Sequence, residues 1–186
     1  MGTELRAIPE ATFHDGDLLL FRRWGFISAA GRSEYSHCGK VGLWHGTPMC
    51  VEVREGVGGR AVTVESQVAK YPGRIDLFTA NASNRWQGTW NADRAVEEMI
   101  SFCGQPYGWW HVFLVGLRHA PVVRWFVKPL TSDVHPGCHA PFCSEAIALA
   151  AQIGGVDPVP HLAARLTEPA DLARSPFYEY QCTLVP

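Results

Sequence analysis

The sequence lacks several features that would place the protein in a specialised class. No apolar run reaches the roughly 18 residues that a membrane-spanning helix needs, and no signal peptide is visible at the start. The 16 basic and 18 acidic residues form no block that would indicate binding to nucleic acid. There is no CxxC pair, internal repeat, low-complexity segment or linker. We therefore expect a single domain over residues 1–186 that is cytoplasmic or virion-associated and has no nucleic-acid partner.

The composition indicates a folded globule with reduced cysteines. Hydrophobic residues make up 47% of the chain and charged residues 18%. Six cysteines are irregularly spaced, and we interpret most of them as buried thiols that behave as small apolar side chains. They are Cys38, Cys50, Cys103, Cys138, Cys143 and Cys182.

Strand patterns dominate the first half of the chain and helical patterns the second. Strands are predicted at residues 16–21, 37–44, 49–55, 60–65, 74–78 and 177–185, with a turn of more than two residues at 45–48. Helices are predicted at 66–73, 91–104, 109–117, 143–153 and 167–175, the last capped by Thr167, and residues 1–15 as an irregular lead-in. This order predicts an α+β domain with helices on one face of a largely antiparallel sheet.

Cys143 is the candidate nucleophile because it stands at the predicted start of the 143–153 helix. The free N–H groups of a helix start favour a thiolate, and the N–H of Cys143 itself can donate to an oxyanion. A reactive thiol also needs a histidine within hydrogen-bond reach. Of the eight histidines, His37 is favoured because a strand holds an imidazole more accurately than a loop.

Glu52 is the candidate third residue, which would orient the imidazole. Antiparallel pairing about the 45–48 turn brings it near the start of the preceding strand, and Glu55 is a nearby rival. Ser36 and Tyr107 are candidates to line a substrate cleft. Each residue also has a structural interpretation: a buried thiol, a hydrogen-bonded core histidine, a solvated glutamate and a packed aromatic ring.

Six segments resemble, in their order, the permuted NlpC/P60 proteins, and most closely the YiiX-like group of papain-like thiol hydrolases. The segments are GDLLLF, YSHCGKVGLW, VEVREGVG, GQPYG, FCSEAIALA and TEPADLARS. The resemblance implies a circularly permuted papain-like fold with a central antiparallel sheet. It also implies Cys143 as nucleophile, His37 as base and Glu52 as the orienting residue, with no cofactor. This chain departs from the family pattern at Cys38 and in an insertion-like hydrophobic segment at about 109–130.

The resemblance implies a cysteine hydrolase that cleaves amide bonds, such as those of cell-wall peptides, through a thioacyl-enzyme. Three alternatives stay open. One is a lipid acyl hydrolase or acyltransferase of the same fold, and another is a non-enzymatic virion or scaffold component in a larger assembly. The third is a zinc site built from His135, Cys138, His139 and Cys143, although the paired ligand spacing of zinc sites is absent.

Overall fold

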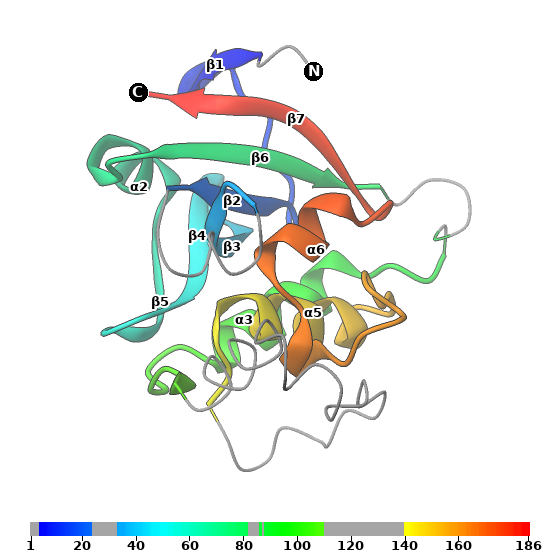
Figure 1. Ribbon diagram of the computed structural model, residues 1–186. Helices are drawn as coiled ribbons and strands as arrows, with labels where there is room; N and C mark the ends of the chain where they lie inside the picture. Colours follow the sequence, from blue (N-terminus) through cyan, green and yellow to red (C-terminus); the bar gives the residue numbers. More distant parts are fainter. Residues whose placement is uncertain (1–3, 24–32, 82–85, 87, 110–139) are drawn as a thin grey trace.

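In the part of the chain that the structure describes, seven strands form one mixed sheet. Figure 1 shows the computed structural model. The structure describes residues 4–23, 33–81, 86, 88–109 and 140–186. The strands are β1 (Leu5–Ala7), β2 (Leu18–Arg22), β3 (Tyr35–Trp44), β4 (Thr47–Arg54), β5 (Gly58–Thr63), β6 (Arg74–Ala80) and β7 (Tyr178–Val185). They lie side by side in the order β1-β7-β6-β2-β3-β4-β5.

Helices cover both faces of this sheet. The α-helices of the described residues are α2 (Val64–Lys70), α3 (Ala92–Ser101), α5 (Cys143–Ile153) and α6 (Pro169–Arg174). Two 3₁₀ helices, η1 (Ile8–Glu10) and η4 (Ala164–Leu166), complete them. The observed fold is therefore α+β, as predicted. Within the described residues, no helix is both long and apolar enough to cross a membrane.

The central strand β2 explains why two cores form. Its residues Leu18–Phe21 are completely buried, and successive side chains point to opposite faces. Leu18 and Leu20 belong to the core under α3, α5 and α6, whereas Leu19 and Phe21 belong to the core under α2. A continuous apolar run is the pattern of a strand that is buried on both faces.

The helix α5 begins at Cys143 and places this residue next to the sheet. Its alanines favour a helix, the N–H of Phe142 donates to Glu145 Oε2 at 3.3 Å, and Gly154 ends the helix. The helix packs against both α3 and β3, and Figure 1 shows α3 and α5 together on one side of the sheet. Its first turn therefore lies against the strand that carries His37.

The largely antiparallel sheet is confirmed, since five of the six strand pairings are antiparallel, but two other predictions are wrong. The predicted irregular lead-in contains β1, which pairs with β7 in parallel. Three residues are too short to show a strand period, and this strand is fixed by its partner. The helices also do not share one face, since Val64 and Val68 of α2 pack with Leu19 and Phe21 on the opposite side.

Two local predictions are also wrong. The turn between β3 and β4 has only two residues, His45 and Gly46, because Thr47 pairs with Trp44. Both turn residues have positive φ, of 50° and 81°, as a tight hairpin turn requires. The residue that caps α6 is Glu168, whereas the Thr167 hydroxyl donates to the carbonyl of Ala163 at 3.4 Å.

The predicted helix at 109–117 falls almost entirely outside the described residues. The described residues on either side of 110–139 meet, because the N–H of Gly108 donates to the carbonyl of Pro141 at 3.1 Å. A single domain with an insertion-like segment at about 109–130 stays a prediction.

The packing of α5 leads to a matched stability test on one helix. Ile147 is completely buried, whereas Ile153 is 41% exposed. Ile147→Ala should lower the free energy of unfolding by about 2–5 kcal/mol, because it leaves a cavity beside β3. Ile153→Ala should change it by less than about 0.5 kcal/mol. Urea denaturation of the two variants checks this, and equal losses would contradict the packing of α5 described above.

Candidate active site

His37 and Glu52 form a short, buried hydrogen bond between neighbouring strands. His37 Nε2 lies 2.6 Å from Glu52 Oε2, and the glutamate side chain is completely buried. The Phe21 ring packs against the imidazole with 4.9 Å between ring centroids. The β-strand positions and this ring contact fix the orientation of the imidazole, and Nδ1 is the ring nitrogen that remains for another partner.

The Glu52 carboxylate is also held from the side opposite His37. Its Oε1 accepts hydrogen bonds from Arg60 Nε at 2.8 Å, Arg60 Nη2 at 2.6 Å and Gln67 Nε2 at 2.6 Å. Arg54 Nη1 adds a looser ion pair at 3.8 Å. Buried carboxylates are stable in proteins when they are paired and hydrogen-bonded in this way.

Cys143 lies close enough to His37 for each side chain to shift the pKa of the other, and the Cys38 thiol of β3 and the backbone N–H of Ser144 also act on the sulfur. Cys143 is only 1% exposed, whereas the His37 side chain is 15% exposed. Solvent therefore reaches this group of side chains over the imidazole.

These interactions lower the pKa of the Cys143 thiol and raise the pKa of the His37 imidazole. The hydrogen bond from Cys38 lowers the pKa of Cys143 most; burial opposes this, but the hydrogen bond and charge of His37 keep the pKa well below its usual value. Burial alone would lower the pKa of His37, but Cys143 and Glu52 outweigh it and raise the pKa to about 9. This pair of shifts favours a thiolate beside an imidazolium.

The carboxylate pKa shifts in the direction that supports this pair. Burial would raise the pKa of Glu52, but His37 and then Arg60 lower it to about 2. The paired charges also stabilise the fold. Because the folded His37 has the higher pKa, its contribution is complete below about pH 6.5 and is lost as the pH rises through about 9. The contribution of Glu52 is present above about pH 4.5 and is lost as the pH falls through about 2.

The two predicted cleft residues lie in different surroundings. Burial is the main cause that raises the pKa of the Tyr107 hydroxyl, and Cys143 is the next, so Tyr107 lies within electrostatic range of the sulfur. The Ser36 hydroxyl instead donates to the carbonyl of Phe21 and lies next to the Tyr71 hydroxyl, each at 3.3 Å.

Three contact residues were not found from the sequence as parts of this site. Arg60 and Gln67 hold the carboxylate, and Cys38 contacts the thiol. Arg60 pairs directly with Glu52 in the β4–β5 register, so an opposite-charge cross-strand pair was the signal for it. Cys38 was visible only as a departure from the family pattern, and Gln67 required the position of α2.

The zinc alternative involves residues that the structure leaves undescribed. His135, Cys138 and His139 lie outside the described residues. Among the described residues, no group of three or more His, Cys, Asp or Glu side chains is arranged to hold a metal ion. We therefore assign none of the described residues to a metal.

The coupling of Glu52 to His37 can be tested by titration. Glu52→Gln removes the negative charge that helps to raise the pKa of His37, so the imidazole should titrate at a lower pH than about 9. Glu55→Gln changes an exposed turn residue and should leave this titration unchanged. NMR titration of the His37 ring in the two variants measures the effect. An unchanged titration in Glu52→Gln would remove Glu52 from the site.

The fold is shared with a solved protein at low sequence identity. The metalloprotein YiiX from Escherichia coli O157:H7 matches 92% of this chain over 98% of its own, with 14% identity and a TM-score of 0.60. No family model matches the sequence, and the search of curated proteins gives no match. At this identity the likeness establishes the fold alone. The resemblance to the YiiX-like group is thus confirmed as a structural one.

Proposed function

We propose that the protein is a cysteine hydrolase that cleaves amide bonds, with peptides such as cell-wall cross-links as substrates. The proposal is carried by the bond of the His37 imidazole to the buried Glu52 carboxylate and by the mutual pKa shifts of His37 and Cys143, which support a Cys–His–Glu site. A lowered thiol pKa beside a raised imidazole pKa supplies both a nucleophile and an acid at neutral pH.

The reaction has two steps. The Cys143 thiolate attacks the amide carbonyl, the new C–S bond forms, and the C–N bond breaks as protonated His37 gives its proton to the leaving amine. Neutral His37 then takes a proton from water, which attacks the thioester, and the C–S bond breaks to release the acid and restore the thiolate. Glu52 keeps the ring oriented in both steps.

Two donors are available for the oxyanion. The backbone N–H of Cys143 is at the start of α5, where helix N–H groups are free to bind an anion. The Tyr107 hydroxyl is near enough to Cys143 for the sulfur to raise its pKa, and burial raises that pKa further, so that the hydroxyl keeps its proton. We assign Tyr107 as the second donor, a role more specific than lining the cleft.

The rates at which the thiols are alkylated distinguish an activated nucleophile from a cysteine that is merely more exposed. Cys103 is more exposed than Cys143, but burial raises the pKa of its thiol. Iodoacetamide at neutral pH should therefore label Cys143 first, and His37→Ala should slow this labelling. Peptide mass spectrometry over time measures both rates. Labelling of Cys103 before Cys143 would contradict an activated thiol.

Mass spectrometry also tests which class of substrate the protein cleaves. Incubation with muropeptides should give released product, or an acyl adduct on Cys143 that intact-mass analysis detects. The product and adduct should be absent from Cys143→Ala and retained in Cys103→Ala. Reaction with phospholipids and not with muropeptides would instead establish the lipid alternative. Reaction with neither pool would contradict the proposed hydrolase.

A matched pair of variants tests the role of Tyr107 as an oxyanion donor. Tyr107→Phe should lower kcat by about 10²–10³-fold, the usual effect of losing one oxyanion donor, with a smaller change in KM. Tyr180→Phe removes a hydroxyl that bonds to Thr183 at 3.1 Å, away from Cys143, and should leave kcat unchanged. Steady-state kinetics on the substrate identified above checks both, and an unchanged kcat in Tyr107→Phe would reject it as a donor.

A further inference from the structure

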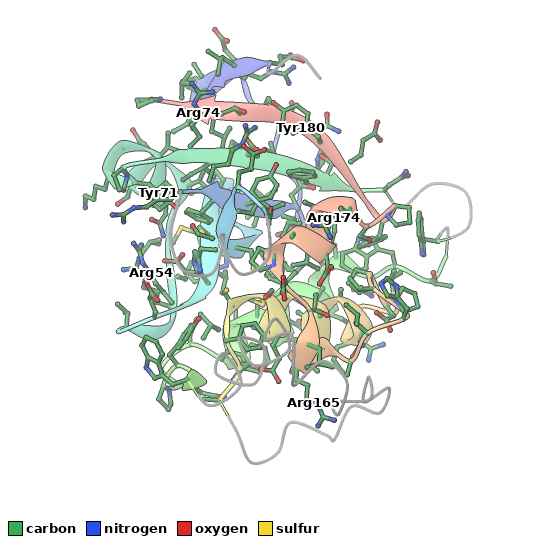
Figure 2. All side chains as sticks on the ribbon, in the orientation of Figure 1. Arg54, Tyr71, Arg74, Arg165, Arg174 and Tyr180 are labelled. Carbon is green, nitrogen blue, oxygen red and sulfur yellow. The ribbon has the colours of Figure 1, made fainter. Side chains whose placement is uncertain are left out.

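A cavity lies on the α2 side of the sheet, beside the side chains that hold Glu52. It has a volume of about 400 Å³ and is lined by Arg54, Val57, Arg60, Val62, Ser66, Gln67, Lys70 and Tyr71. The lining comes from β4, β5, the turn between them, α2 and the residue that ends α2. In Figure 2, Arg54 and Tyr71 lie at the same edge of the molecule, away from Arg165 and Arg174.

The register of the hairpin explains why the cations share one side. Arg54 lies two residues after Glu52 on β4, so the two side chains point to the same face. Arg60 is directly opposite Glu52 on β5 and faces the same way. Lys70 follows Ser66 by four residues on α2, which places both on one side of that helix. The cavity therefore collects three cationic side chains from three elements.

The three cationic side chains of the cavity outnumber the one carboxylate that its two arginines contact. This is the buried carboxylate of Glu52, whose Oε2 is bonded to His37 at 2.6 Å and whose Oε1 faces the arginines. Arg60 bonds to that oxygen through Nε and Nη2, whereas Arg54 approaches it no closer than 3.8 Å. Two positive charges thus remain uncompensated by Glu52, and Lys70 is exposed at the opening.

Phosphate is the anion whose chemistry fits this lining. It carries about 1.5–2 negative charges near pH 7 and several strong acceptor oxygens. Guanidinium groups donate to such oxygens in pairs, and lysine serves as a point charge. The hydroxyls of Ser66 and Tyr71 add polar groups, and Val57, which is 59% exposed, offers an apolar contact for an ester substituent.

We propose that this cavity binds a phosphate group, in free form or as a phosphate ester, through Arg54, Arg60 and Lys70. The proposal does not require thiol catalysis, since none of these three side chains acts on the scissile bond. It gives the protein a second recognition site, one hydrogen bond from the carboxylate that orients His37.

The binding experiment uses the Cys143→Ala protein, so its outcome does not depend on catalysis. Isothermal titration calorimetry at low ionic strength would measure inorganic phosphate, glycerol 3-phosphate and monomeric dihexanoyl-phosphatidylglycerol, with glycerol as the neutral control. Saturable binding of at least one phosphate probe is expected. Arg54→Gln and Lys70→Gln should each weaken it by about tenfold or more, the usual effect of losing a charge-assisted hydrogen bond.

A matched control distinguishes a site from general attraction to a basic surface. Arg74→Gln removes an exposed arginine at the start of β6, outside the cavity, and should leave binding unchanged. Tighter binding of the phospholipid would identify a lipid phosphate as the ligand, and equal or tighter binding of the soluble probes a free phosphate or small ester. Absence of saturable binding by all three probes, or equal weakening by Arg74→Gln, would overturn the proposal.

Discussion

The buried carboxylate of Glu52 is the constraint on which this edge of the protein depends. It is completely removed from solvent and accepts hydrogen bonds from β3, β5 and α2. A charge in such a place is tolerated only when every partner is present, and removal of one partner costs several kcal/mol. One side chain thus fixes the β4–β5 hairpin, the position of α2 and the orientation of His37 together.

The Cys143 thiol depends on a different set of partners from the Glu52 carboxylate. The pKa of Cys143 is lowered by Cys38, by His37 and by the N–H of Ser144. The helix start and β3 must therefore be in register for the thiolate to form. Burial would by itself keep a thiol protonated, so these three partners outweigh the loss of solvent that accompanies a nearly inaccessible sulfur.

The sequence was sufficient to predict the elements with strong hydrophobic periodicity and the residues whose role depends on their immediate neighbours. Cys143 at a helix start and Glu52 opposite a valine face follow from spacing alone, and the structure brings both to His37. The parallel pairing of β1, the side on which α2 packs and the contact of Cys38 with the thiol were not predicted. Each of these depends on distant register or packing, which a short segment does not encode.

The two oxygens of Glu52 join the two sites that we propose. Oε2 bonds to the imidazole and Oε1 to Arg60, so the imidazole and the positive charge of Arg60 share a single carboxylate. A phosphate held by Arg54 and Arg60 would offset that positive charge. The imidazolium would then be stabilised further, and the thiolate–imidazolium pair would persist to higher pH. Occupancy of the cavity and protonation of the imidazole are therefore linked, each favouring the other by the same free energy.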